Sequence, residues 1–420
     1  MALLTHLPFP ALPAPPSWFP GHMLAFQKQL PALLNKTDVV LELRDARLPL
    51  TSINRNFEGA HILQKWRKER AGAAAPSSSV DASLNGPSYS AVCERLVVFS
   101  KRDLVPEWGI KPFQRALATK YPHQKTFFAS WNQQRDIKAL NELLVNVAKA
   151  HPYRTELNVL VVGMPNVGKS TLLNALRNIG IAGPTPKAFR TSAQPGMTRV
   201  LSTRLKLSTD PLVYAFDSPG VMLPFLGNGA AGAERGVKLA LIAGIKEGLY
   251  DTEALAAYLL YRLNVLDPAA PAYLGLLAPG TPPTPDLHDF LAALARRHGM
   301  LRRGGVPDVS RAAVWFVRWW RDEGGRATAT ASAAVPLADG GRHGWGFDLE
   351  WAVRAGERYD AGAVQAHMER AIDAFEAASA AEMEAGGGLS QTQEKKMAKA
   401  EQRARQQERA RARFAERRSG

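Results

Sequence analysis

Gly163-Met164-Pro165-Asn166-Val167-Gly168-Lys169-Ser170 is the stretch that decides the fold of this 420-residue chain. It follows an apolar run, 157–162, that reads as a strand, and it precedes a good helix start at 171–176. Glycines let such a loop wrap phosphates with backbone N–H groups, while Lys169 neutralises phosphate oxygens and the Ser170 hydroxyl ligates Mg²⁺. The stretch therefore predicts a nucleoside triphosphate site whose binding residues here are Gly163, Asn166, Val167, Gly168, Lys169, Ser170 and Thr171.

Two downstream segments match the parts of such a site that meet Mg²⁺ and the terminal phosphate. Asp217-Ser218-Pro219-Gly220 ends an apolar strand, so Asp217 can hold Mg²⁺ through water and the Gly220 N–H can meet the γ-phosphate. Alone, this pattern also fits a surface turn, but its place downstream of a phosphate loop favours the nucleotide site. Between the two lies 194–199, which offers Thr198 as a switch threonine for Mg²⁺ and phosphate; a plain Pro-Gly turn is the alternative.

Ser100-Lys101-Arg102-Asp103 precedes the phosphate loop and has the spacing of a guanine-reading segment. The Asp103 carboxylate can accept hydrogen bonds from guanine N1–H and the amino group, and the Lys101 stem can pack over the ring. Guanine-specific GTPases usually carry Asn where Ser100 stands, which alters one contact with the base. An ordinary strand-to-helix turn is the alternative interpretation. After the next strand, the backbone of Ala129 and Ser130 is a weaker match to the segment that supports guanine O6.

The order of these segments, with the base-reading segment ahead of the phosphate loop, indicates a circularly permuted GTPase. Closing the usual ends of the domain and reopening the chain ahead of the base segment keeps the same sheet and site. The expected fold is α/β, a mostly parallel sheet flanked by helices, followed by a smaller all-α domain and a basic tail. Expected strands are 38–43, 96–99, 125–128, 157–162, 199–207 and 212–216, and expected helices of the second domain are 237–249, 253–263, 287–298 and 309–321.

These runs also suggest domain boundaries. We expect a variable N-terminal segment at 1–17, the permuted GTPase domain at 18–225, the helical domain at 226–385 and the basic tail at 386–420. Stretches rich in Ala, Ser, Thr, Gly and Pro at 71–91 and 324–344 are expected to be flexible insertions because they cannot bury a core. Since the second switch, Asp217-Ser218-Pro219-Gly220, leads directly into the helical domain, we expect nucleotide state to bias the position of that domain.

Charge narrows the class of partner. The net charge of +15 favours a polyanion, either nucleic acid or an anionic membrane surface. Residues 391–418 hold ten basic and four acidic side chains and, with Arg302-Arg303, suit an RNA phosphate backbone; a solvated charge run is the alternative. No run reaches the roughly 18 apolar residues that a membrane-spanning helix needs, so any membrane contact is expected to be peripheral.

The remaining composition says little about the compartment. Cys93 is the one cysteine, which excludes an internal disulfide framework and a multi-cysteine zinc site. Residues 1–17 match neither a secretory signal nor an Arg-rich transit peptide, so targeting cannot be read from them.

Several motifs together resemble the YlqF/RbgA family of ribosome-assembly GTPases. They are the opening Trp18-Phe19-Pro20-Gly21-His22-Met23, Asp45-Ala46-Arg47 with Pro49, the permuted motif order and Lys238-Leu239-Ala240-Leu241. The insertions, Tyr258-Leu259-Leu260-Tyr261 and three tryptophans, Trp315, Trp319 and Trp320, look most like its mitochondrial branch; for the tryptophans, a place in a helix core is favoured over stacking on bases. The resemblance implies action on the large mitoribosomal subunit and association with the matrix face of the mitochondrial inner membrane.

The same resemblance points to a catalytic residue. Val221 stands where Ras-like enzymes place a water-orienting Gln, and an aliphatic side chain cannot orient water. In this family the His of the opening motif is the proposed substitute, which maps onto His22; a structural role is the alternative. Asn166 matches a phosphate-loop Asn of potassium-stimulated GTPases, with loop stabilisation as the alternative. The expected cofactors are therefore Mg²⁺, at Ser170, Thr198 and Asp217, and K⁺ at Asn166.

The motifs and this resemblance together imply a GTPase that acts in assembly of the large mitochondrial ribosomal subunit in support of mitochondrial translation. It is expected to dock on the rRNA of that subunit in its GTP state and to leave after hydrolysis. The alternative is a peripheral inner-membrane scaffold or translation regulator that uses GTP as a conformational latch. GTP-dependent RNA modification is disfavoured because the sequence holds no second catalytic constellation.

Overall fold

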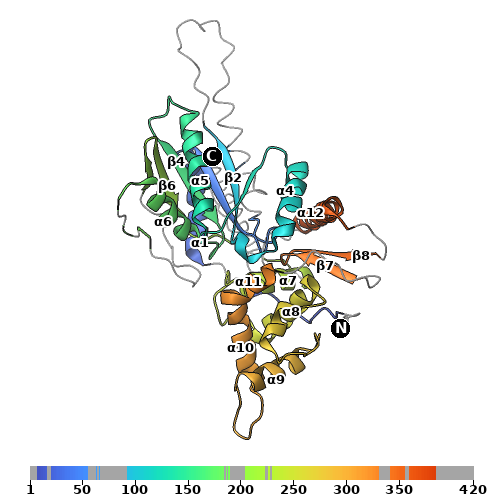
Figure 1. Ribbon diagram of the computed structural model, residues 1–420. Helices are drawn as coiled ribbons and strands as arrows, with labels where there is room; N and C mark the ends of the chain where they lie inside the picture. Colours follow the sequence, from blue (N-terminus) through green and yellow to red (C-terminus); the bar gives the residue numbers. More distant parts are fainter. Residues whose placement is uncertain are drawn as a thin grey trace, which may run out of the picture.

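A six-stranded sheet forms the centre of the computed structural model, and helices cover both of its faces (Figure 1). The structure describes residues 7–16, 20–54, 63, 66, 92–183, 186, 188–189, 204–222, 226–227, 229–330, 341–354 and 359–384. The expected insertion at 71–91, the switch segment around Thr198 and the tail 386–420 lie outside these ranges.

The strand order of this sheet is β3-β2-β1-β4-β6-β5. All neighbouring pairs are parallel except β5 and β6, which are antiparallel. The strands are β1 (Val39–Asp45), β2 (Glu94–Ser100), β3 (Lys125–Phe128), β4 (Leu157–Gly163), β5 (Leu205–Thr209) and β6 (Leu212–Asp217). β4, which leads into the phosphate loop, lies in the middle of the sheet, although β1, β2 and β3 precede it in the chain. This order is that of a permuted domain and confirms the expected mostly parallel α/β sheet.

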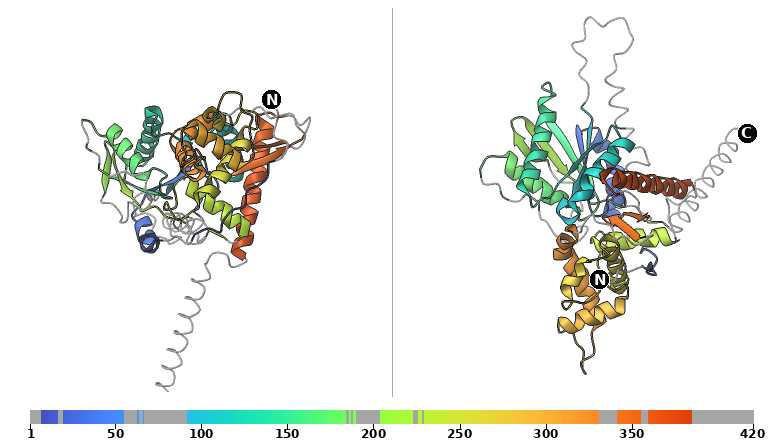
Figure 2. Two further views of the ribbon diagram at one scale, coloured as in Figure 1. Left: turned by 90° about the horizontal axis from the view of Figure 1, so that it is seen from below. Right: turned by 45° about the vertical axis from the view of Figure 1, so that its right-hand side comes forward.

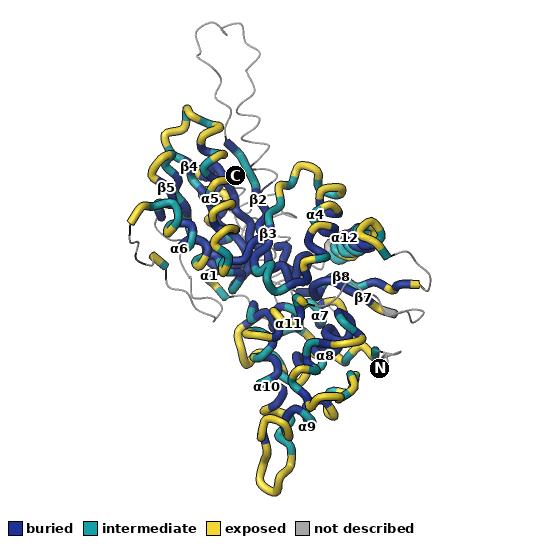
Figure 3. Tube along the Cα trace, in the orientation of Figure 1, coloured by how far each residue is buried: buried dark blue, intermediate teal, exposed yellow. Residues whose placement is uncertain are grey.

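Side chains alternate between the two faces of the sheet along each strand, and this explains why helices cover both faces. Leu41 and Val161 belong to one buried cluster, shared with helices α5 (Gln134–Lys149) and α6 (Lys169–Gly180). Val40 and Leu160 point to the opposite face, into a cluster with Phe26 and Leu30 of α1 (Gly21–Leu34). Because successive side chains of a strand face opposite sides, burial on both faces explains the continuous apolar runs 39–41 in β1 and 159–162 in β4. Figure 3 shows the buried sheet between helices with exposed outer surfaces.

Residues 229–330 form a helical part beside the sheet (Figures 1 and 2). Three of its helices begin at Asp residues whose carboxylates accept from backbone N–H groups of the first turn, at Asp251, Asp286 and Asp308. The elements are α7 (Gly229–Leu241), α8 (Thr252–Leu266), η2 (Ala272–Leu276), α9 (Leu287–Arg297), α10 (Val309–Trp319), the π-helical turn η3 (Trp320–Gly324) and α11 (Gly325–Ala329). The loop between α9 and α10 is the part of this unit farthest from the sheet (Figure 1).

The first expected helix of this part is wrong in its bounds. The prediction was 237–249, but α7 begins at Gly229 and ends at Leu241. Ala243 has a left-handed backbone with φ of 57°, and the Gly244 N–H donates to the Leu239 carbonyl at 2.8 Å. A left-handed residue just past the last turn ends a helix in this way.

Expectation and structure also differ beyond residue 330, where an all-α arrangement was predicted. β7 (Gly341–Trp345) and β8 (Leu349–Val353) form an antiparallel pair, followed by α12 (Ala361–Glu384), which packs beside α4 (Glu107–Lys120). Trp345 is fully buried, and its Nε1 donates to the Pro106 carbonyl at 2.8 Å. These elements share a cluster with Phe99 and Phe113, so they pack against the GTPase sheet.

The expected insertion 324–344 is wrong at both ends. Residues 324–329 are helical, and Gly324 and Thr328 are buried; residues 341–344 belong to β7. Small side chains are required there, because a Cβ on Gly324 would lie 2.7 Å from the Trp319 ring. The part between, 331–340, lies outside the described residues. Within the described ranges, no helix combines the length and apolar character needed to cross a membrane.

Candidate functional site

The phosphate loop connects β4 to α6, and its two outer glycines occupy backbone conformations that suit only glycine. Gly163 has φ of 151°, and a Cβ there would lie 2.5 Å from the Leu43 carbonyl oxygen. Gly168 has φ of 93°, and a Cβ there would lie 2.4 Å from Trp131 Nε1. Both approaches are closer than a side chain tolerates. Val167 is buried, and Thr171 is exposed on the first turn of α6.

Lys169 is buried beneath this loop. Its Nζ donates to the carbonyls of Met164 at 2.8 Å and Gly163 at 3.2 Å. Burial lowers the pKa of Lys169 to about 8, and the nearby charge of Asp217 opposes that shift. An ammonium held in a low-dielectric site gains strongly from an anion, and phosphate oxygens supply one. The side chain is therefore placed to bind phosphate at the start of α6.

Ser170 and Asp217 bring two hard oxygen ligands together at the ends of α6 and β6. Ser170 Oγ donates to Asp217 Oδ2 at 2.6 Å. Burial raises the pKa of Asp217, whereas Lys169 and the Ser170 hydrogen bond act to lower it. Hydroxyl and carboxylate oxygens are ligands that Mg²⁺ prefers, and a bound cation would stabilise this buried carboxylate. Thr198, the third expected ligand, lies outside the described residues.

The turn after β6 packs directly onto the phosphate loop. A Cβ on Gly220 would lie 2.7 Å from Pro165 Cα, so only glycine fits. The Val221 N–H donates to the Gly163 carbonyl at 3.1 Å, and Asn54 Nδ2 donates to the Val221 carbonyl at 3.1 Å. The backbone of the second switch is thus bonded to the first residue of the phosphate loop.

The base-reading segment lies at the carboxyl end of β2. Lys101 has a left-handed backbone with φ of 59°, and its Nζ donates to the Asn166 carbonyl at 3.0 Å, which joins this segment to the phosphate loop. Asp103 lines a cavity that Asn166 and Gly168 of the phosphate loop also line, and it accepts from Asn132 Nδ2 at 3.4 Å. The Arg102 N–H donates to the Ala129 carbonyl at 3.2 Å, which ties this segment to the one after β3.

Two of the expected base contacts are engaged elsewhere in the protein. Ser100 is fully buried, and its Oγ donates to the Arg44 carbonyl of the neighbouring strand at 3.1 Å. The Ser130 N–H donates to Asp136 Oδ2 at 2.8 Å. The Ser100 hydroxyl therefore holds β2 to β1 in this structure, and Asp136 fixes the turn that follows β3.

Asp45 is a site residue that the sequence reasoning missed as such. It is fully buried at the end of β1 and accepts from Arg47 Nε at 3.0 Å and from Lys101 Nζ at 2.9 Å. Burial alone would raise the pKa of Asp45, but Arg47 and Lys101 outweigh burial and hold that pKa below its ordinary value. Burial lowers the pKa of Lys101, and Asp45 opposes this. The available signal was a charged Asp-Ala-Arg directly after a strand, at the same sheet edge as the phosphate loop.

These elements line one cavity of about 580 Å³. Trp131, another residue that the sequence reasoning did not single out, lines it beside Gly168. Its Nε1 is buried and has no hydrogen-bond partner within the described part of the chain. The base-reading segment, the turns after β1 and β3, the phosphate loop, the start of α6 and the helical part all border this cavity. The lining residues are Arg47, Lys101, Asp103, Leu104, Ser130, Trp131, Asn132, Asn166, Gly168, Thr171, Ile242, Ala243, Glu247, Arg318, Arg321, Asp322 and Arg326.

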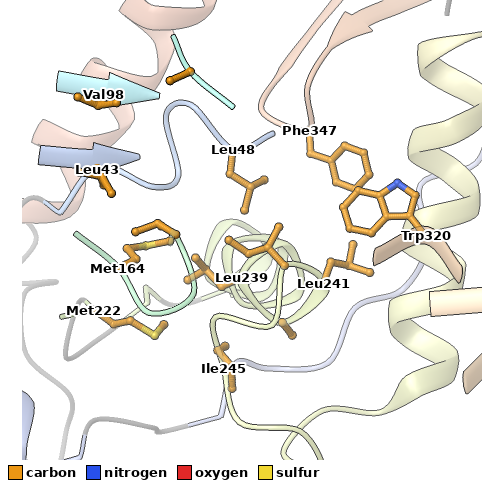
Figure 4. Close-up of a cluster of buried hydrophobic side chains, with 14 of the residues drawn as sticks. Leu43, Leu48, Val98, Met164, Met222, Leu239, Leu241, Ile245, Trp320 and Phe347 are labelled. Carbon is orange, nitrogen blue, oxygen red and sulfur yellow. The ribbon is translucent and has the colours of Figure 1, made fainter. Parts of the chain in front are cut away.

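The helical part touches the phosphate loop itself. Asn166 has φ of 60°, and its Nδ2 donates to the Ala243 carbonyl, just past the end of α7, at 2.7 Å. Met164 and Met222 lie beside Leu239 of α7 (Figure 4). The Asn166 side chain therefore stabilises the loop against α7 in this structure, which agrees with the loop-stabilising alternative and leaves a K⁺ ligand role as a prediction.

His22 is the second residue of α1 and is half-buried. The next residue, Met23, is fully buried, and Phe26 of the same helix shares a cluster with Val221. α1 therefore packs beside the second switch. The segment ahead of it contacts α8, where the Phe9 ring lies 5.3 Å from that of Tyr261 between centroids.

A phosphate loop on a central parallel strand, a second switch bonded to it and a base-reading segment joined to it by Lys101 define a P-loop GTPase with permuted strand order. Residues 158–259 match the family described as 50S ribosome-binding GTPase. "Mitochondrial GTPase 1" of Schizosaccharomyces japonicus is 31% identical over 73% of this chain and 87% of its own length. "Mitochondrial ribosome-associated GTPase 1" of Xenopus tropicalis is 29% identical over 72% and 90%. The chain belongs to this mitochondrial GTPase 1 family and is a GTPase.

Among solved structures, GNP-bound YlqF from T. maritima covers 73% of this chain and 94% of its own, at 19% identity and a TM-score of 0.39. The permuted order is seen in this chain itself, where β4 lies in the middle of the sheet although three of the other strands precede it in the sequence.

Proposed function

We propose that this GTPase acts in mitochondria, where it binds the large ribosomal subunit and its rRNA in the GTP state, supports assembly of that subunit and is released after hydrolysis. The observation that carries the proposal is the hydrogen bond from Asn166 to the Ala243 carbonyl. This bond connects the phosphate loop to the helical part, so the nucleotide state can change the surface that a partner meets. The names of the relatives and the net charge of +15 support a ribosomal, polyanionic partner.

In this proposal the phosphate loop holds GTP, with Lys169 at the β- and γ-phosphates. The pair Ser170 and Asp217 fits Mg²⁺, because their oxygens lie 2.6 Å apart in a buried site, and Thr198 completes the ligand set from the switch. Bound Mg²⁺ neutralises phosphate charge. Lys101 packs over the guanine ring and Asp103 accepts from its edge, while Asn166 is the proposed K⁺ ligand.

His22 is the proposed group that orients the attacking water, because Val221 is fully buried and aliphatic. His22→Ala is expected to lower kcat for GTP hydrolysis about 100-fold, the usual contribution of such a group, while the Kd for GTP changes less than about 2-fold. Single-turnover hydrolysis and calorimetry measure the two quantities. His123→Ala, at an exposed His remote from the phosphate loop, serves as the control. Unchanged turnover in His22→Ala would remove His22 from catalysis.

Large mitochondrial subunits from the same organism are expected to raise GTP turnover at least about 10-fold, since the missing catalytic contact is completed on the ribosome. Small subunits are the matched control. Absence of stimulation by mature and immature large subunits would contradict the ribosome-activated GTPase.

Salt-dependent co-sedimentation separates this function from that of a membrane scaffold. Recovery with large subunits that falls steeply with salt supports rRNA binding, because each neutralised phosphate adds to the salt dependence. Recovery with anionic vesicles and not with subunits would instead support the peripheral inner-membrane role.

A further inference from the structure

Part of the wall of the nucleotide cavity comes from the helical part, through Arg318, Arg321, Asp322 and Arg326. We propose that Arg326, together with Arg318 of the same cavity lining, binds the guanosine portion of the nucleotide. The helical part is then a component of the GTP site itself. This inference rests on GTP binding alone and is independent of the proposed ribosomal role.

Arg326 lies next to the base-reading turn because α11 packs directly onto η1 (Arg102–Leu104). A Cβ on Gly325 would lie 3.3 Å from Leu104 Cδ2. Asp103 immediately precedes Leu104, and Arg326 immediately follows Gly325. The contact between the two elements therefore places the cation and the base-reading carboxylate at borders of one cavity.

The other cations of the cavity are already committed to protein partners. Arg47 and Lys101 bind Asp45. Arg321 Nε and NH2 donate to the carbonyls of Leu241 and Ala240, each at 2.8 Å, and NH1 donates to Glu247 at 2.6 Å. Arg321 therefore holds the end of α7 with three of its five N–H donors, and its charge is paired with Glu247.

Arg318 and Arg326 differ from these committed cations. Both are exposed on the cavity wall, and the described residues give neither an ion-pair nor a hydrogen-bond partner. Two carboxylates, Asp322 and Glu247, share the wall, and Glu247 is bound to Arg321. The available charge on the helical side is thus two guanidinium groups against the carboxylate of Asp322.

Guanosine offers what a guanidinium group recognises. Its base has a planar face on which the guanidinium plane can stack, and its ribose carries oxygen acceptors. Lys101 covers one face of the base from the sheet side. Arg326, on α11, supplies cover from the helical side, and Arg318 of α10 lines the same cavity.

The test is calorimetric binding of GMP, GDP and a non-hydrolysable GTP analogue to the full chain in the presence of Mg²⁺. Arg326→Ala is expected to weaken all three about 10-fold, Arg318→Ala with Arg326→Ala together about 30-fold, and Arg326→Lys less than Arg326→Ala, because Lys keeps the charge but not the plane. An equal loss for GMP and GTP identifies the guanosine portion as the contact.

Arg303→Ala is the matched control, since it removes the same charge from the exposed loop between α9 and α10. Thermal unfolding checks that each variant is folded. Affinities within about 2-fold of wild type in the double variant, a loss equal to that of Arg303→Ala, or a loss confined to the GTP analogue would overturn the proposal.

Discussion

Asp103→Asn is expected to lower the affinity for GTP about 100-fold and to transfer preference to xanthosine triphosphate. The carboxylate is proposed to accept two hydrogen bonds from the guanine edge, each worth about 1.5–3 kcal/mol when one partner is charged. An amide replaces one acceptor with a donor, which meets the guanine amino group unfavourably but matches the C2 carbonyl of xanthine. Competition binding with GTP, ATP and xanthosine triphosphate measures the change.

Asp322→Asn provides the control, because it makes the same chemical change on the helical wall of the same cavity. It should leave guanine preference intact. If Asp103→Asn still bound GTP tightly and still rejected ATP, Asp103 would not be the base-reading residue.

The second large effect is expected at Asp45. Asp45→Ala leaves Arg47 and Lys101 without their buried counter-charge, which costs about 3–5 kcal/mol of unfolding free energy. It also frees Lys101 from its position at the Asn166 carbonyl, so affinity for GDP should fall in parallel. Urea unfolding and GDP calorimetry measure the two effects, and Asp45→Asn, which keeps the volume and one acceptor, is the variant to use should Asp45→Ala not fold.

The stability that Asp45 contributes through Arg47 and Lys101 depends on pH in one direction. The pKa of Asp45 in the folded protein lies below its ordinary value of 3.8, so its stabilisation is present above that value and is lost as pH falls below it. Wild type, but not Asp45→Asn, should lose this contribution on acidification. Glu156→Ala, which breaks the exposed pair with Arg204, is the control and should change stability by less than about 1 kcal/mol. A change that small at Asp45 would contradict the buried-pair assignment.

The parts of the fold that the sequence predicted are those fixed by local chemistry. Gly163 and Gly168 punctuate a loop between an apolar run and a helix start, and the structure shows why no side chain fits at either position. The permuted order followed from where Ser100–Asp103 stands relative to that loop, since parallel strands deliver their carboxyl ends to one edge whatever their order in the chain.

The parts that were missed depend on contacts between distant segments. β7 and β8 border a Gly- and Ala-rich stretch with no strand pattern of its own, and they are held by Trp345 packing against Phe113 on α4, with ring centroids 5.2 Å apart. The end of α7 is fixed by Arg321, which lies in η3, the fifth element after α7 in the chain. Asp45 became recognisable as a site residue only when β1 and β2 brought it to Lys101.

The return of β7, β8 and α12 to the GTPase sheet has a mechanical consequence. Residues 229–330 follow β6 and precede β7, so this unit is joined to the GTPase part at both ends, unlike a domain appended at one end. Its apolar side chains also share a buried cluster with the sheet. We therefore expect a change at the nucleotide site to reach this unit through Asn166 and through the α11 contact with η1.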